Sequence, residues 1–166
     1  TWWSFYGRND GTCSHHERTR LMIAECSSKE ATQTLAGKLA QKIPVGSVVA
    51  LIGNLGTGKT TFTQGFAKGL GITDTVGSPT FKLISEYDGD PLNLYHIDCY
   101  RLKNEIDFLN IGGEALLTQD DGITLIEWAD IIKKILPSNV ITINFSILDG
   151  YPNSRQIEII GILDED

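Results

Sequence analysis

The sequence predicts an α/β fold of three layers, in which helices cover a mixed, partly antiparallel sheet. A glycine-rich segment at residues 53–60 lies between a short apolar run and a helical pattern, as in a strand-turn-helix unit of a parallel sheet. Two strand-like runs that follow are joined by a short turn, and two more lie near the end of the chain. Such hairpins require antiparallel pairs beside the parallel part of the sheet.

The first predicted element is a helix over residues 28–43. Ser27 and Glu30 match a capping box, S-x-x-E. The apolar residues that follow recur at helical spacing: Ala31, Leu35, Ala36, Leu39 and Ile43. Pro44 and Gly46 predict the end of this helix.

The second element is a buried strand over residues 47–52, which leads into a phosphate loop. Gly53-Asn54-Leu55-Gly56-Thr57-Gly58-Lys59-Thr60 matches G-x-x-x-x-G-K-[ST]. In this context the backbone N–H groups and the start of the next helix, including Thr61, would bind polyphosphate. Lys59 is placed to reach the β- and γ-phosphates, and the Thr60 hydroxyl to bind Mg²⁺. The pattern predicts a P-loop NTPase fold, since four fixed positions recur by chance only about once in a hundred chains of this length.

The remaining elements follow in order along the chain. Phe62, Phe66 and Leu70 lie on one face of the helix after the loop and are predicted core residues. Residues 81–87 and 92–98 predict a hairpin across the turn at residues 88–91, and residues 102–119 predict short helical stretches. A buried strand at residues 123–126, a helix at 129–136 and a strand pair at 140–147 and 156–162 complete the domain.

Two acidic residues follow predicted strands and are candidates for catalysis. Asp98 ends the strand at residues 92–98, and Glu127 follows the apolar strand at 123–126. Mg²⁺ beside the phosphate-loop hydroxyl prefers a carboxylate partner, which either acid could supply, although a carboxylate at a strand end is often only solvated. Thr80, after Gly77-Ser78-Pro79, is the predicted sensor of the γ-phosphate.

Three further residues have open roles on sequence alone. Trp128 could pack on a nucleotide or complete the core. His96 lies in a strand pattern and is more typical of a partnered structural histidine than of a base. Arg101 could contact phosphate or a neighbouring acid.

Composition limits the classes of partner and compartment. The net charge is −7, with 14 Lys and Arg against 21 Asp and Glu, so binding of DNA is not expected and any link to RNA would run through a partner. Neither a bilayer-spanning stretch nor a secretory signal is recognisable, so we expect a cytoplasmic protein without a membrane partner. Cys13, Cys26 and Cys99 form no C-x-x-C pattern, which favours reduced thiols over a disulfide or zinc site.

Residues 1–21 differ from the rest of the chain. They contain four aromatic residues and two histidines without a lasting period of 2 or 3.6. We therefore expect an unstructured leader, a fragment of upstream reading frame or a cloning remnant, followed by a P-loop ATPase domain at residues 22–166. A functional aromatic anchor is the alternative for this segment.

Four ordered motifs together resemble one family. The phosphate loop is followed by three further segments: Ser78-Pro79-Thr80-Phe81, Tyr95 to Leu102, and Leu125-Ile126-Glu127-Trp128. In this order and spacing they resemble the TsaE family, also called YjeE, of bacterial ATPases needed for threonylcarbamoyladenosine modification of tRNA. The resemblance covers residues 27 to about 160.

The resemblance implies ATP binding and slow hydrolysis coupled to TsaB and TsaD homologues, whose complex modifies adenosine 37 of tRNAs that decode ANN codons. It also implies nucleotide binding and turnover for the residues matching Lys59, Thr60, Asp98, Glu127 and Trp128, with Thr60 and Glu127 at the Mg²⁺ site. The chain departs from the family pattern at Asn54, Gly77 and Asp130, where an acid, Thr and Glu are common. These positions bear on partner affinity or rate more than on ATP binding.

Two other functions remain open on the residues alone. A small-molecule kinase uses the same loop, but only Arg101 and Arg155 follow residue 21, too few for an arginine-rich lid. A nucleotide-dependent interaction module would use ATP to order a loop with negligible hydrolysis. A GTPase is disfavoured because N-K-x-D does not occur, and the D-x-x-G match at residues 74–77 lacks a preceding apolar strand.

Overall fold

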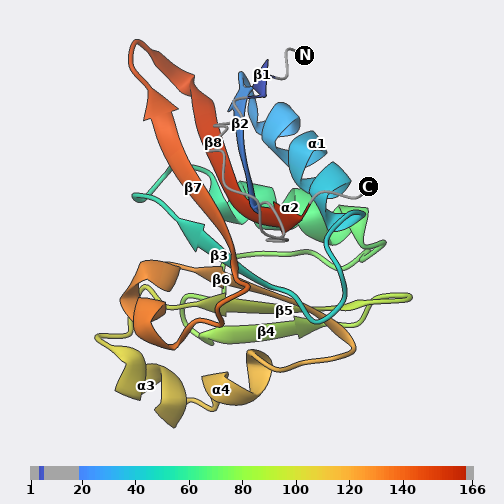
Figure 1. The fold of residues 1–166 in the computed structure, drawn as a ribbon, viewed down its shortest axis with the longest axis vertical. Helices are drawn as coiled ribbons and strands as arrows, with labels where there is room; N and C mark the ends of the chain where they lie inside the picture. The colour runs from blue at the N-terminus through green and yellow to red at the C-terminus, as the bar shows by residue number, and fades with distance from the viewer. Residues whose placement is uncertain (1–3, 6–18, 164–166) are drawn as a thin grey trace, which may run out of the picture.

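The computed structural model of the chain describes residues 4–5 and 19–163 (Figure 1). The strands in this part are β1 (Ser4–Phe5), β2 (Thr19–Cys26), β3 (Val48–Ile52), β4 (Ile84–Tyr87), β5 (Asn93–Asp98), β6 (Gly122–Glu127), β7 (Ile141–Leu148) and β8 (Tyr151–Leu163). The helices are α1 (Lys29–Ala40), α2 (Lys59–Gly69), α3 (Glu105–Asn110), α4 (Gly113–Leu116) and the 3₁₀ helix η1 (Ala129–Ile135).

The strands form a mixed sheet in the order β1-β2-β8-β7-β3-β6-β5-β4. The four neighbours β7, β3, β6 and β5 are parallel to one another, whereas β8, β2 and β1 on one side and β4 on the other join by antiparallel pairing. The predicted mixed, partly antiparallel sheet is confirmed. The parallel centre matters for function because all four of its strands end at the same edge of the sheet.

Helices cover both faces of the sheet, which gives the predicted three layers (Figure 1). Helices α1 and α2 bury Leu35 and Phe62 in one core with Leu125 of β6. On the opposite face, Phe108 of α3 packs in a second core with Ile126, the next residue of the same strand. Consecutive side chains of β6 point to opposite faces of the sheet, so this strand contributes residues to both cores, as a strand between two helical layers requires.

Helices α1 and α2 approach each other at glycines. A Cβ on Gly65 would lie 2.7 Å from the carbonyl carbon of Gln33 in α1, and one on Gly69 would lie 2.7 Å from the Cα of Gly37. This close crossing holds α2, which begins with the lysine and threonine of the phosphate loop, firmly against α1.

Several predicted boundaries differ from the structure for local reasons. The N-cap of α1 is Ser28, not Ser27: its Oγ accepts from the Ala31 amide at 3.1 Å. The strand predicted from residue 81 begins at Ile84, because Leu83 has a positive φ of 68° that a strand does not allow. The helix predicted at 129–136 is the 3₁₀ helix η1, interrupted at Ile132 (φ −114°, ψ 23°).

The predicted domain start at residue 22 falls inside β2, which begins at Thr19. This strand pairs antiparallel with β8, and Ser4 and Phe5 of β1 pair with β2 in turn. The exclusion of residues 1–21 from the fold is therefore wrong for residues 4–5 and 19–21, because β1 and β2 are held by long-range backbone hydrogen bonds that leave no local period. Residues 1–3 and 6–18 lie outside the described part of the chain.

Two of the three cysteines are described. Cys26 and Cys99 are buried free thiols, while Cys13 lies outside the described residues. Within residues 4–5 and 19–163, the helices lack the length and apolar character that crossing a membrane requires.

Candidate functional site

The site lies at the edge where the parallel strands β3, β6 and β5 end. Leu51 of β3 is in register with Glu127 of β6, and Glu127 is in register with Asp98 of β5. The phosphate loop leaves β3 one residue later. The two predicted acids and the loop thus lie side by side, although they are separated along the chain.

The loop is shaped to bring main-chain amides close to an anion. Gly58 has φ 101°, a conformation that glycine adopts without strain, and a Cβ on Gly53 would lie 2.8 Å from the Phe145 carbonyl oxygen. Helix α2 then starts at Lys59 with no side-chain cap and no acid in its first turn. Its N–H groups and the positive end of its dipole remain available for phosphate.

Lys59 is held inside the loop. Its side chain is buried, and Nζ donates to the carbonyl oxygens of Gly53 (2.6 Å) and Asn54 (3.0 Å). The ammonium also lies 4.3 Å from the ring centroid of Trp128. Burial lowers the pKa of Lys59, while the negative charge of Glu127 acts in the opposite direction. The cation is therefore pre-positioned where the loop would bind phosphate.

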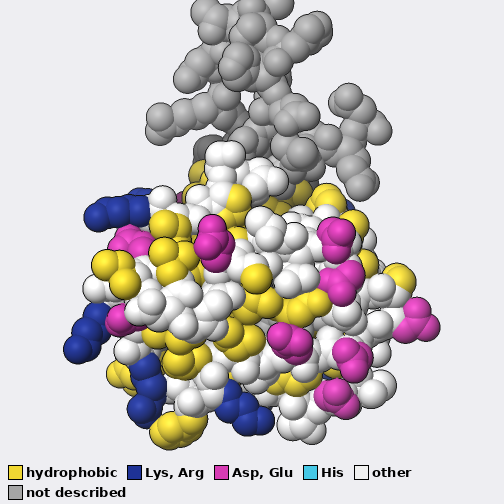
Figure 2. Space-filling model, turned by 90° about the horizontal axis from the view of Figure 1, so that it is seen from below, with side chains coloured by type: hydrophobic (Ala, Val, Ile, Leu, Met, Phe, Trp, Pro, Cys, Tyr) yellow, Lys and Arg dark blue, Asp and Glu magenta, His cyan; other side chains and the backbone are white. Residues whose placement is uncertain are grey.

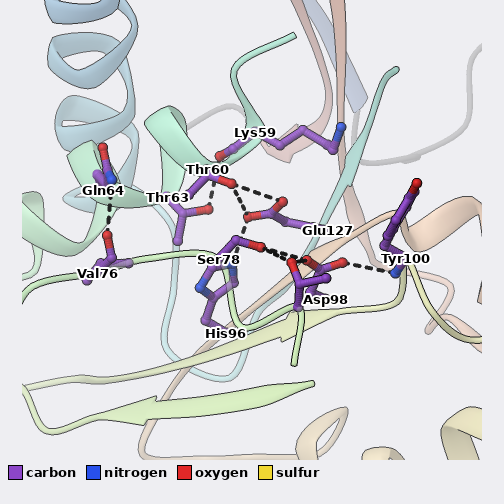
Figure 3. A network of polar contacts seen from close by, with 11 residues as sticks. Lys59, Thr60, Thr63, Gln64, Val76, Ser78, His96, Asp98, Tyr100 and Glu127 are labelled. Atoms are coloured by element: carbon purple, nitrogen blue, oxygen red, sulfur yellow. Dashed lines mark hydrogen bonds and ion pairs between the residues drawn. The ribbon is translucent and has the colours of Figure 1, made fainter. Parts of the chain in front are cut away.

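Thr60 and Glu127, the two residues of the predicted magnesium site, contact each other (Figure 3). The Thr60 hydroxyl donates to Glu127 Oε1 at 3.0 Å and lies 3.3 Å from Oε2. The Glu127 carboxylate is almost completely buried, and its Oε1 also lies 2.9 Å from Nε2 of His96. The predicted preference for His96 as a partnered histidine is confirmed, and its partner is the acid of the site.

Asp98 is surrounded by donors from two loops. Its Oδ2 accepts from the hydroxyls of Ser78 (2.7 Å) and Thr80 (2.8 Å), and its Oδ1 accepts from the Tyr100 amide (2.9 Å). Three acceptor positions are thereby used, so the carboxylate links the 78–80 loop to the end of β5 (Figure 3). Thr80 is connected to the site by its hydrogen bond to Asp98.

Trp128 follows Glu127 with φ 57° and ψ 39°, a left-handed conformation that is costly for an aromatic residue. Its ring stacks at a tilt on Tyr100, with centroids 5.0 Å apart, and faces the Lys59 ammonium. This geometry turns the indole toward the loop. Trp128 therefore lines the site and also packs against the second core.

The other predicted loop residues occupy distinct places. Thr57 is buried, and its hydroxyl donates to the Asn54 carbonyl at 2.7 Å, which stabilises the turn. Leu55 is 77% exposed at the rim, and Thr61 is half-buried in the first turn of α2. These residues shape the loop around Lys59.

Sequence reasoning missed two contacts and left one residue open. The sequence places Ser78 in the segment around Thr80 and predicts no role for its side chain, yet its hydroxyl donates directly to Asp98. Arg155 of β8 donates through Nη2 to the Gly56 carbonyl at 3.1 Å, a contact with no local signal. The guanidinium of Arg101 lies 4.5 Å from the ring centroid of Phe81, so its observed contact is a cation–π pair.

The donor set fits Mg²⁺ held together with a nucleotide. Among the described residues, three or more His, Cys, Asp or Glu do not gather into a metal cluster. A magnesium ion bound with nucleotide needs only one or two protein oxygens, because phosphate and water provide the rest. The adjacent Thr60 hydroxyl and buried Glu127 carboxylate meet that requirement.

Comparisons with known proteins point to one family. The sequence model of a family described as "Threonylcarbamoyl adenosine biosynthesis protein TsaE" matches residues 26–157. Proteins named tRNA threonylcarbamoyladenosine biosynthesis protein TsaE include one from Treponema pallidum, 40% identical over 81% of this chain and 98% of that protein. One from Bacillus subtilis is 45% identical over 65% of this chain and 66% of that protein. The crystal structure of YdiB from Bacillus subtilis superimposes with a TM-score of 0.69 at 36% identity, covering 90% of this chain and 89% of that one.

Proposed function

This chain belongs to the TsaE family of threonylcarbamoyl adenosine biosynthesis proteins, and we propose that it binds ATP with Mg²⁺ and hydrolyses it slowly to ADP and phosphate. The hydrolysis would support formation of N6-threonylcarbamoyladenosine at position 37 of tRNA. One observation carries the proposal: the Thr60 hydroxyl at the uncapped start of α2 lies 3.0 Å from the buried carboxylate of Glu127.

Each residue of the site has a distinct part in this proposal. The amides of the loop and the ammonium of Lys59 bind the phosphates, and Thr60 and Glu127 hold the metal. Bound Mg²⁺ supplies positive charge that offsets charge on the phosphate oxygens. Asp98 orients the hydroxyl of Thr80, which would sense the γ-phosphate, through their 2.8 Å hydrogen bond. Trp128 shields the site from water beside Lys59.

The metal ligand nearest the loop is Glu127 in this proposal. Its carboxylate contacts the Thr60 hydroxyl at the start of α2, whereas the contacts of Asp98 are with Ser78, Thr80 and the Tyr100 amide. Glu127 is therefore the better candidate for metal binding and for orienting the attacking water. Asp98 acts by holding the 78–80 loop.

Homologues of TsaB and TsaD are the proposed partners, with tRNA reached only through them. Figure 2 shows basic side chains only along the left and lower rim of one face, with acidic side chains among them and on the right, so this face carries no broad basic surface. The net charge of −7 likewise disfavours direct binding of tRNA. Two exposed apolar side chains support contact with a protein: Leu55 in the phosphate loop (77% exposed) and Phe81 next to Thr80 (86% exposed).

The proposal is tested by calorimetry and turnover on the purified chain. ATP with Mg²⁺ should release heat of binding, Lys59→Ala should lose most of the affinity, and Lys68→Ala, an exposed lysine in the last turn of the same helix, should not. Turnover should rise when TsaB and TsaD homologues are added. Absence of heat with both ATP and ADP from the folded protein would contradict the proposal.

Two outcomes would indicate the alternatives. A phosphorylated small molecule among the products would identify a kinase. Full tRNA modification by Glu127→Gln, reconstituted with the partners, would identify an interaction module with negligible hydrolysis, because the buried carboxylate beside Thr60 would then be dispensable.

A further inference from the structure

His96 lies inside β5, between β4 and β6, and it contacts the acid of the site. Its side chain is completely buried in β5, two residues before Asp98 and on the same face of the strand. Nε2 lies 2.9 Å from Glu127 Oε1. Its register partner in β6 is the apolar Leu125, so packing at this position does not call for a polar ring.

The contact determines which ring nitrogen carries the proton. An ionised carboxylate can only accept, so Nε2 must donate to Glu127. In the neutral ring, Nδ1 is then an acceptor, and this atom is buried without a hydrogen-bond partner among the described residues. A buried polar atom without a partner costs folding free energy. The Nε2 contact with Glu127 is the one hydrogen bond of this buried ring among the described residues, so it is the feature that needs an explanation.

The same carboxylate oxygen receives a second donor. Glu127 Oε1 accepts from Thr60 at 3.0 Å as well as from His96, and Thr60 also lies 3.3 Å from Oε2. Thr60 is only half-buried in the first turn of α2, whereas the His96 side chain is completely buried in β5 between two neighbouring strands. The histidine is therefore the rigid partner that defines the orientation of the carboxylate (Figure 3).

We propose that His96 is a positioning residue, whose Nε2–H holds the Glu127 carboxylate in the orientation that serves Mg²⁺ and ATP beside Thr60. The proposal rests on the function proposed above. Groups that orient a metal ligand typically change metal affinity or activity by about 10- to 100-fold when they are removed. Loss of the Nε2 donor should therefore change magnesium dependence more than it changes stability.

Three substitutions separate this role from simple packing. His96→Gln places an amide nitrogen near the position of Nε2, His96→Asn places one near Nδ1, and His96→Leu keeps volume without a donor. We expect the Mg²⁺ concentration for half-maximal turnover to rise about tenfold or more in the Asn and Leu variants. The Gln variant should remain within about threefold of the parent, and rescue by Asn instead of Gln would overturn the proposal.

A matched control comes from the preceding residue. The Tyr95 hydroxyl donates to Asp121 at 2.8 Å on the opposite face of β5, so Tyr95→Phe removes one hydrogen bond from the same strand without touching the site. Its magnesium dependence should stay unchanged. An equal shift in Tyr95→Phe and His96→Asn would show that general loosening of β5 is the cause and would overturn the proposal.

A spectroscopic readout does not depend on activity. Proton–nitrogen correlation spectra of the nucleotide-free protein should show His96 as the Nε2-protonated tautomer, with its signals distinguished from those of His15 and His16 by their loss in His96→Gln. An Nδ1-protonated ring would overturn the proposal. If the parent protein fails to bind ATP with Mg²⁺, the proposed function fails and the spectrum still reports on His96. If the parent binds and His96→Asn matches it at every Mg²⁺ concentration, only the positioning role fails.

Discussion

Gly65 lies where α2 crosses α1, and Gly65→Ala is a direct test of how closely the helix behind the phosphate loop is packed. The added Cβ would lie 2.7 Å from the carbonyl carbon of Gln33 and closer still to two other backbone atoms of that residue. Carbon atoms in good contact are about 3.5–4.0 Å apart. Because backbone atoms cannot rotate aside as a side chain can, α1 and α2 must separate by about 1 Å.

The magnitude follows from two opposing terms. Overpacking of a core costs about 1–3 kcal/mol, and a clash with main-chain atoms belongs at the upper end of that range. Alanine is favoured over glycine inside a helix by about 1 kcal/mol. We therefore expect Gly65→Ala to lower the free energy of unfolding by about 2 kcal/mol. With a urea m-value of about 2 kcal/mol/M, the unfolding midpoint falls by about 1 M.

Gly37→Ala in α1 is the matched control. Its Cβ would meet the Gly65 carbonyl oxygen at 3.3 Å and no other atom nearer than 3.8 Å, so a small shift accommodates it. The helix-propensity gain is the same, and stability should stay within about 1 kcal/mol of the parent. Urea denaturation followed by circular dichroism measures both variants. If Gly65→Ala proves as stable as Gly37→Ala, the inferred close crossing is wrong.

Three further predictions concern the site and the core. Thr60→Val removes the hydroxyl that lies 3.0 Å from Glu127, and calorimetry at several Mg²⁺ concentrations should show ATP binding about tenfold weaker. Thr60→Ser keeps the hydroxyl and should keep the affinity, so equal affinities in the two variants would contradict the metal assignment. Burial raises the pKa of the Cys99 thiol from 9.0 to about 12. Its contribution to stability is therefore complete below pH 9 and is lost between pH 9 and 12, with a slope of up to about 1.4 kcal/mol per pH unit. Urea denaturation at pH 8 and 10.5 should show a smaller alkaline loss for Cys99→Ala than for the parent, and equal losses would refute this cause. Arg155→Ala removes the 3.1 Å hydrogen bond to the Gly56 carbonyl, and the ATP affinity measured by calorimetry should fall about three- to tenfold. An unchanged affinity would show that this contact does not support the loop.

Features with a local cause were predictable from the sequence. The phosphate loop depends on glycine conformations and on a helix start within eight consecutive residues, so its pattern is readable without the fold. The strands before Asp98 and Glu127 were likewise visible as apolar runs, and the parallel arrangement that aligns their ends follows from the α/β class.

Features that depend on neighbours far along the chain were decided only by the tertiary structure. Thr60 and Glu127 are 67 residues apart, and a sequence pattern alone does not say which of two acids the hydroxyl will meet. Strand β2 and the contact of Arg155 with Gly56 depend on backbone pairing and on the path of β8, which leave no local period. The chain by itself determined that a phosphate loop would form and which acids could serve it. The pairing of β5 with β6 then placed Glu127 in contact with Thr60 and His96, and placed Asp98 in contact with the 78–80 loop. The physical reason is that strand register and burial, rather than spacing along the chain, determine which side chains meet.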